Sequence, residues 1–335
     1  MLNDLHEISL NIDLHRHLDG NIRPSSIWSL AQQHNIDIGF ETREALLAHF
    51  HQPQLHADLI GFLSQLDLGV SVLANEEAIY RIAYENVEDL LNESIDYAEL
   101  RYSPYYMAMH HQLPMQAVIQ AVTQGVKDAS AEQALKVNLI GILSRTFGAE
   151  QCMHELSAIL AERESFVALD LAGDERGFPA VDFRTHFAQA REQGLAITVH
   201  AGEADGAQSV WSALHDLGAS RIGHGIRSIE DPRLIDYLVE HRIGLECCLT
   251  SNVHTGVWPD LTTHPVKAML ERGVAVTLNT DDPGVSGNTL KDEFELAATY
   301  LGMGSQQQLM LRNNALHQAF MTASEKQALL VQKKD

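Results

Sequence analysis

The chain has 335 residues, of which 45% are hydrophobic and 20% are charged, an ordinary balance for a globular enzyme. Its 45 acidic side chains outnumber 23 basic ones, which argues against nucleic acid or an anionic membrane as the main partner. The three cysteines do not form a disulfide pattern, and neither a signal peptide nor a membrane-spanning run is visible. We therefore expect one cytoplasmic domain over 1–335 with no obligate protein partner.

The first predicted strand, Ile12–His17, ends in two histidines that share one face because side chains alternate along a strand. A long helical section follows over about 24–91. Helices are predicted there at 25–31, 43–50, 55–68 and 75–91. In the third of them, Leu59, Phe62, Leu63 and Leu66 recur at helical spacing and form one apolar face.

From residue 96 onward, strands alternate with single helices up to a helical tail that begins near 290. The strands are predicted at 96–102, 137–143, 166–171, 195–200, 221–224, 244–249 and 274–280. Eight such units predict a parallel α/β barrel, the (β/α)8 or TIM fold, with the helices of 24–91 covering the C-terminal rim. The alternative, a doubly wound open sheet, usually has a Gly-rich phosphate loop after its first strand, where this chain has His-Arg-His-Leu-Asp-Gly.

Polar side chains lie at or just after the ends of four of the predicted strands. The carboxyl ends of parallel barrel strands meet at one rim, where the active sites of such barrels lie. A single histidine or aspartate after a strand is more often a helix cap or a rim residue, but the same pattern on four strands indicates a site. The residues concerned are His15, His17, His200, Glu203, His224, Asp281 and Asp282.

Four of these side chains form a plausible set of metal ligands. Three imidazoles and one carboxylate suit a single zinc ion that keeps an open position for water, although cobalt or iron would accept the same ligands. A second metal in such barrels is commonly bridged by a lysine on the fourth strand, and no lysine occurs between Lys136 and Lys267. We therefore expect one Zn²⁺ per chain, bound by His15, His17, His200 and Asp281.

The remaining groups suit hydrolytic chemistry. A bound metal lowers the pKa of its water toward ~7, which provides hydroxide at neutral pH. Glu203 is the expected acid/base group, and His224 is expected to orient the water. Asp282 remains available to hydrogen-bond a substrate.

Taken together, seven segments resemble the adenosine deaminase family, and they occur in family order along the whole barrel. They are 15–20, 100–104, 170–175, 199–203, 221–225, 250–252 and 279–283. The resemblance implies that hydroxide supplied by zinc attacks C6 of a purine nucleoside while Glu203 protonates N1 and His224 holds the hydroxide. Asp281 then counts as catalytic as well as a metal ligand.

The same resemblance implies a set of substrate contacts. Asp282 would bind N7, the Gly173 N–H would bind N3, and Asp19, close to His17, would meet the ribose 5′-hydroxyl. The helix with Leu59 and Phe62 resembles the lid over the substrate. These two side chains and His17 complete the expected substrate-binding residues.

Two positions depart from the family pattern: Leu249 replaces a frequent proline and Leu66 a frequent aromatic residue. Both concern substrate affinity rather than the chemistry. Adenine deaminases tend to have glutamate where Asp19 stands and lack the 170–175 segment, so a nucleoside is favoured over the free base. We expect a single metal-dependent deaminase domain that converts adenosine and 2′-deoxyadenosine in purine salvage. The alternatives are a deaminase of another 6-aminopurine and a nucleoside-binding protein without catalysis.

Overall fold

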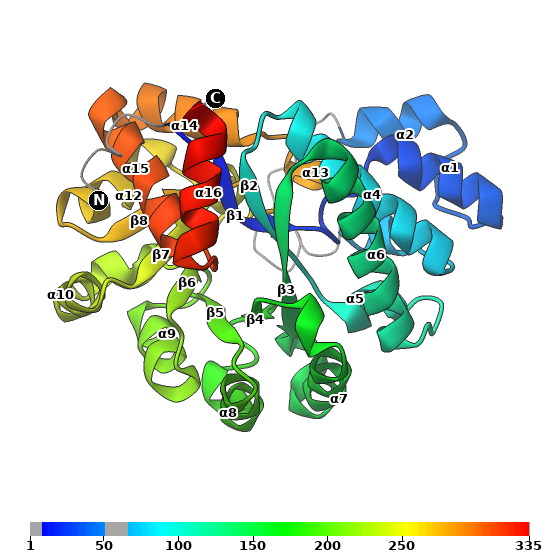
Figure 1. Ribbon diagram of the computed structural model, residues 1–335, viewed down its shortest axis with the longest axis horizontal. Helices are drawn as coiled ribbons and strands as arrows, with labels where there is room; N and C mark the ends of the chain where they lie inside the picture. Colours follow the sequence, from blue (N-terminus) through cyan, green and yellow to red (C-terminus); the bar gives the residue numbers. More distant parts are fainter. Residues whose placement is uncertain (1–8, 51–65, 335) are drawn as a thin grey trace.

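The chain forms a nearly closed barrel of eight parallel strands, each paired with the next in sequence (Figure 1). A computed structural model describes residues 9–50 and 66–334. The strands are β1 Ile12–His17, β2 Tyr97–Tyr102, β3 Lys136–Ser144, β4 Ala168–Ala172, β5 Ala196–Ala201, β6 Arg221–His224, β7 Gly244–Cys247 and β8 Ala275–Leu278. The predicted TIM barrel is therefore confirmed.

The seam between β1 and β8 closes at the carboxyl ends of these two strands. Arg16 and Asp281 form an isolated parallel bridge there. Two backbone hydrogen bonds of 2.8 Å complete it, from the His17 N–H to the Asp281 carbonyl and from the Asp281 N–H to the His15 carbonyl. The last contact of the barrel is thus made by residues that the sequence predicts to be metal ligands.

Helices surround the strands in a ring (Figure 1). Those that follow the second strand are α5 Pro104–Ala108, α6 Met115–Gln133, α7 Gly148–Ala161, α8 Arg184–Glu192, α9 Ala207–Ser212, α10 Pro232–His241, α11 Leu249–His254, α12 Val266–Glu271, α13 Pro283–Ser286, α14 Leu290–Leu301, α15 Ser305–Gln318 and α16 Ala323–Lys334. In the described part of the chain, no helix combines the length and apolarity that a bilayer crossing requires.

The insertion after β1 contains α1 Pro24–His34, α2 Arg43–Phe50 and α4 Glu76–Asn92. Helix α4 begins at Asn75, whose side chain accepts a hydrogen bond from the Ala78 N–H, and it packs beside α6 in the ring. The two helices approach so closely that a Cβ on Gly125 would lie 2.6 Å from the Tyr80 carbonyl oxygen. Most of the predicted 55–68 helix, including Leu59 and Phe62, lies outside the described residues.

The interior of the barrel contains a buried ionic network. Arg101 pairs with Asp170 and with Glu246, at 2.7 Å each. Arg221 pairs with Glu246 and Glu99, and its guanidinium lies 3.9 Å from the centre of the Phe320 ring. Apolar branched side chains usually fill the core of such a barrel. Here charged groups connect the rim to the opposite end.

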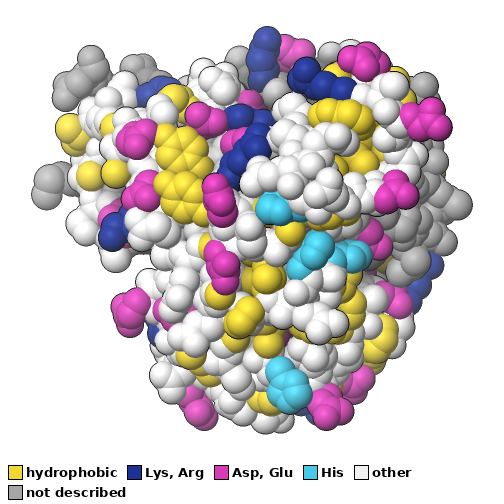
Figure 2. All heavy atoms as spheres, turned by 90° about the vertical axis from the view of Figure 1, so that its right-hand side faces the viewer, with side chains coloured by type: hydrophobic (Ala, Val, Ile, Leu, Met, Phe, Trp, Pro, Cys, Tyr) yellow, Lys and Arg dark blue, Asp and Glu magenta, His cyan; other side chains and the backbone are white. Residues whose placement is uncertain are grey.

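The outer surface is mixed in character. On the face turned toward the viewer in Figure 2, acidic, basic and apolar side chains are interspersed. The formal charge of −22 is therefore not gathered into one patch on that face.

Candidate active site

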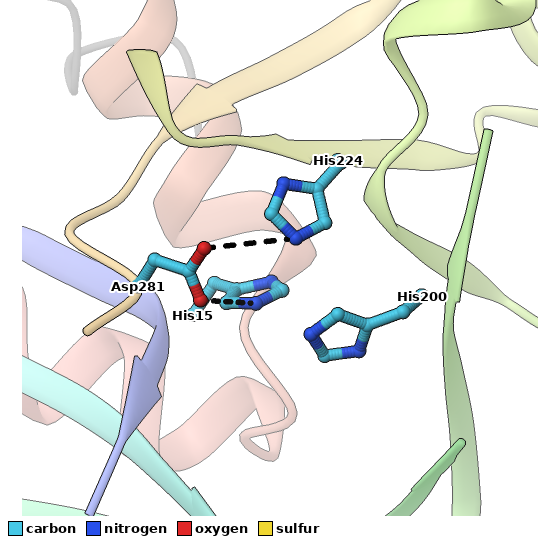
Figure 3. Close-up of side chains that lie close together, drawn as sticks. All are labelled: His15, His200, His224 and Asp281. Carbon is cyan, nitrogen blue, oxygen red and sulfur yellow. Dashed lines mark ion pairs between the residues drawn. The ribbon is translucent and has the colours of Figure 1, made fainter. Parts of the chain in front are cut away.

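Four of the predicted site residues converge at the C-terminal rim, where β1, β5, β6 and β8 end: His15, His200, His224 and Asp281 (Figure 3). His15 Nε2 lies 3.3 Å from Asp281 Oδ1, and His17 Nε2 lies 3.4 Å from the same oxygen. His17 Nε2 is also 3.2 Å from His200 Nε2. Ligands held tetrahedrally at about 2.0–2.1 Å from a zinc ion are about 3.3–3.4 Å apart, so these spacings fit a metal.

Carboxylates behind two histidines fix their ring orientation. His15 Nδ1 lies 2.7 Å from a Glu246 oxygen, and His200 Nδ1 lies 3.0 Å from an Asp170 oxygen. In each pair the Nδ1–H donates to the carboxylate, which leaves the Nε2 lone pair directed into the site. His15 Nε2 is buried and has no hydrogen-bond partner, as expected of a metal ligand. Burial lowers the pKa of His200 to about 3, so its imidazole is neutral.

His17 and His224 are the two candidates for the fourth ligand of the metal-binding group. Potential ligand atoms of His15, His200, His224 and Asp281 all lie within 4.8 Å of one another, and this buried group could hold a metal ion. His224 Nε2, however, is 3.7 Å from its closest Asp281 oxygen, whereas His17 Nε2 lies at ligand spacing from two members. The geometry therefore favours His17 as the ligand and places His224 beside it.

The backbone is strained at two site residues. His224 has φ 58° and Asp281 has φ 66°, a left-handed conformation that non-glycine residues rarely adopt. Such strain persists where the surrounding structure holds it and is concentrated at functional sites. His224 is the last residue of β6 and Asp281 lies in the segment after β8, and both side chains point into the metal-binding group (Figure 3).

Glu203 lies on the loop after β5, and Glu175 holds this loop. One Glu175 oxygen accepts hydrogen bonds from the N–H groups of Ala204 and Asp205, at 2.8 Å each, and the other accepts from Gly202 at 2.6 Å. The Glu203 carboxyl is buried 3.7 Å from His224 Nε2. Burial, reinforced by the charge of Asp281, raises the pKa of Glu203 to about 8. The group can therefore hold a proton near neutral pH.

A cavity of about 330 Å³ opens beside the metal-binding group, a volume suited to a small organic ligand. Asp19 and Gly173 both line it. The Asp19 carboxylate is fixed there because it accepts the Ser103 N–H at 2.9 Å. Gly173 has φ 109°, and a Cβ at that position would lie 2.4 Å from Thr146 Oγ1. Only glycine can therefore occupy this part of the wall.

Asp282 lines the cavity and has an unsatisfied oxygen. Its Oδ1 is buried without a hydrogen-bond partner. A Cβ on Gly20 would lie 1.7 Å from this oxygen, so the glycine leaves room for it. Burial and the charge of Asp281 raise the pKa of Asp282 well above its usual range. These surroundings favour the protonated form of Asp282, in which the group can donate a hydrogen bond.

The structure brings together every predicted site residue that it describes; Leu59 and Phe62 lie outside the described residues. Sequence reasoning missed the supporting roles of Asp170, Glu175 and Glu246. One signal could have indicated two of them: a charged residue inside an otherwise apolar strand, as Asp170 is in β4 and Glu246 in β7. Because strand residues alternate, such a residue at an inward position must find a buried partner.

Comparisons with known proteins agree with this geometry. The family model described as adenosine deaminase matches residues 11–334. The adenosine deaminase of Edwardsiella ictaluri is 53% identical over 318 residues, which cover 95% of this chain and 96% of the relative. The adenosine deaminase of Photorhabdus laumondii is 51% identical, with 95% of each chain covered.

Solved structures show the same architecture. The adenine deaminase of Arthrobacter aurescens superposes with a TM-score of 0.90 at 26% identity, covering 98% of each chain. The Arabidopsis N6-mAMP deaminase gives a TM-score of 0.83 at 25% identity, covering 99% of each chain. With its family segments gathered around one buried site, the chain belongs to the adenosine deaminase family.

Proposed function

We propose that the chain is a zinc-dependent adenosine deaminase that converts adenosine and 2′-deoxyadenosine to inosine and 2′-deoxyinosine, with release of ammonia, in purine salvage. The observation that carries the proposal is the buried histidine–aspartate group beside Glu203 at a nucleoside-sized cavity. Relatives at about 50% identity over nearly the whole chain support the same reaction. Three buried free cysteines are typical of a reducing compartment, which supports a cytoplasmic location.

The proposed zinc ligands are His15, His17, His200 and Asp281. Their spacing and the orphaned Nε2 of His15 support a single metal at this point. When bound, zinc lowers the pKa of a water molecule toward about 7 and so supplies a hydroxide nucleophile.

The neighbouring side chains perform the proton chemistry. The protonated Glu203 donates its proton to purine N1, which makes C6 electrophilic. The Nε2–H of His224 donates a hydrogen bond to the attacking oxygen, and the neutral Asp282 donates to N7. A C6–O bond forms, and the proton of the added hydroxyl passes to the exocyclic amino group. The C6–N bond then breaks, ammonia leaves, and a C6 carbonyl remains with the Glu203 proton on N1.

Parallel assays on adenosine, adenine and AMP test the proposed substrate. We expect zinc-loaded protein to deaminate adenosine with the highest kcat/KM of the three. The solved relatives include an adenine deaminase and an N6-mAMP deaminase, so the other two substrates are informative. A faster reaction with adenine or AMP would overturn the assignment to nucleosides, and no turnover of any substrate would favour a binding protein.

Asp19 provides a sharper test because its carboxylate is proposed to bind the ribose 5′-hydroxyl. Asp19→Ala should lower kcat/KM for adenosine by roughly 10–100-fold, the value of a hydrogen bond to a charged group. With 5′-deoxyadenosine, which lacks the hydroxyl, wild type and variant should differ much less. If kcat/KM fell equally for both substrates, Asp19 would act only by holding the cavity wall in place. Asp236→Ala, at an exposed aspartate, is the control.

A further inference from the structure

We propose that Asn252 and His264 are positioning residues that hold the His224 imidazole in the tautomer with its proton on Nε2, facing the reacting groups. The inference deepens the proposed function, on which it rests, by giving a structural origin to the donor role of His224. Neither residue touches the cavity-facing nitrogen of His224. They act on the opposite side of the ring, through a short chain of buried hydrogen bonds.

The chain of hydrogen bonds begins at a group whose role is unambiguous. The backbone N–H of Val266, in the first turn of α12, lies 3.3 Å from Nδ1 of His264. A backbone N–H can only donate, so this Nδ1 accepts and carries no proton. Burial lowers the pKa of His264 to about 3, so the ring is neutral and its one proton is on Nε2.

That proton determines the orientation of the next side chain. His264 Nε2 lies 3.1 Å from Oδ1 of Asn252, in α11, and donates to it. With its oxygen committed to His264, the Asn252 amide directs its NH₂ toward His224. Asn252 Nδ2 lies 3.2 Å from His224 Nδ1. Because the amide nitrogen only donates, His224 Nδ1 must accept, and the imidazole proton of His224 is on Nε2.

Burial makes this order of donors and acceptors costly to reverse. His224, Asn252 and His264 are 1%, 0% and 3% exposed, so water cannot replace a mismatched partner. Turning the Asn252 amide over would place two donors face to face at His264. Its oxygen would then face His224 Nδ1, which puts two acceptors together unless the imidazole proton moves to Nδ1. A buried polar atom without a partner costs about 1–3 kcal/mol, so the network has one low-energy arrangement.

The consequence concerns what His224 can do in the site. Its Nε2 lies 3.7 Å from oxygens of both Glu203 and Asp281. A nitrogen that carries a proton has no lone pair for a metal, so His224 is excluded as a ligand in this tautomer and acts as a hydrogen-bond donor. The fourth ligand position then belongs to His17. This chain of hydrogen bonds thus supports the choice that the distances favour, with His17 as the ligand and His224 as the donor.

Nitrogen NMR of ring-¹⁵N-labelled wild-type protein tests the tautomer without relying on activity. Spectra of the metal-free and zinc-loaded protein should show His224 with a protonated Nε2 and an unprotonated Nδ1, the signals being assigned by their loss in His224→Gln. A protonated Nδ1 in the zinc-loaded protein would overturn the inference. An inactive protein with the expected tautomer would instead overturn the proposed function, so the two failures are distinguishable.

Variants test whether the tautomer matters for the reaction. In Asn252→Asp the carboxylate accepts from His224, so the proton moves to Nδ1 and kcat should fall by roughly 10²-fold or more, as for other wrong-tautomer histidines. KM and zinc content should change much less. The exposed Asn92→Asp is the matched control. Asn252→Asp with wild-type kcat would contradict the inference.

A second pair of variants does not depend on Asn252→Asp being folded. His264→Gln retains an N–H that can donate to Asn252 Oδ1, whereas His264→Leu removes the donor and frees the amide to turn. The loss of kcat should be clearly larger in His264→Leu, and only this variant should show a mixture of His224 tautomers. Equal losses with an unchanged His224 spectrum would mean that His264 has a packing role alone.

Discussion

The pKa values of two adjacent carboxyl groups, Asp281 and Asp282, shift in opposite directions, because their surroundings differ. Burial alone would raise both pKa values. The nearby imidazoles of His15 and His224 outweigh it at Asp281 and hold the pKa of that group well below its usual range. Asp282 faces the negative charge of Asp281, so its pKa is raised well above its usual range. One acid can thus serve as an anionic ligand while its neighbour donates a proton to a hydrogen bond.

Glu203→Gln tests the proposed proton donor. Because the proton goes from Glu203 to N1, the activity should be present below the pKa of this group and be lost as pH rises through it. Burial, reinforced by the charge of Asp281, raises that pKa to about 8, and a bound cation lowers it. The variant should lose ~10²-fold or more in kcat, retain its zinc, and lack the basic limb in a plot of kcat/KM against pH. If the basic limb remained in the variant, a group other than Glu203 would cause it. The control is Glu240→Gln, at an exposed glutamate, which should resemble the wild type.

Secondary-structure elements at the rim are held by buried glutamates that come from a neighbouring segment. Glu175 binds the loop after β5, Glu155 of α7 binds the Tyr105 and Ser144 N–H groups, and Glu293 of α14 binds the first N–H groups of α11. Each carboxylate replaces several water molecules around backbone donors that would otherwise be buried and unsatisfied. Rim loops of this kind are fixed before a ligand arrives.

Glu175→Gln should disturb the loop that carries Glu203. The substitution replaces one acceptor oxygen with an NH₂ that must face backbone N–H donors, so the loop has to move. We expect kcat to fall by about 10-fold or more, since a charged hydrogen bond is worth ~1.5–3 kcal/mol. Zinc content should remain at one per chain, because the proposed ligands lie outside the loop that Glu175 binds, with His200 held in β5. Unchanged kinetics in Glu175→Gln would show that the loop keeps its position without the carboxylate. The control is Glu150→Gln, at an exposed glutamate near the start of α7.

The strands and the ligands at their ends could be predicted because consecutive strands of a parallel barrel lie side by side and all end at the same rim. His15, His200 and Asp281 are far apart in sequence, but each lies at or just beyond the carboxyl end of a strand, which is sufficient to bring them to one rim. The anchoring role of Glu175 and the pairing of His264 with Asn252 could not be predicted in this way. They depend on which loops touch above the barrel, and no periodicity in the sequence records that contact.

At the scale of the whole molecule, the ionic network links the metal site to the opposite end of the barrel. Glu246 contacts His15 at the rim and Arg221 below it, and Arg221 donates to the Gln318 carbonyl at 2.8 Å near the C-terminal helices. Arg221→Met would leave Glu246 and Glu99 with unpaired buried charge. Removing one partner of a buried pair costs ~3–5 kcal/mol. Denaturant unfolding should show that loss, whereas Arg233→Met, at an exposed arginine, should show little.

Metal removal should destabilise the entire fold, since the proposed ligands lie on β1, β5 and β8 and span the seam where the barrel closes. A metal that binds only the folded chain stabilises it by ~2.7 kcal/mol at 100 times its Kd, which corresponds to roughly 5 °C in Tm. Chelation should therefore lower Tm by about that amount, and added zinc should restore it. In His15→Asn the response to zinc should largely disappear, while the exposed His154→Gln should keep it. If the Tm of the wild type did not change on removal and addition of zinc, the contact between β1 and β8 would be held by hydrogen bonds alone.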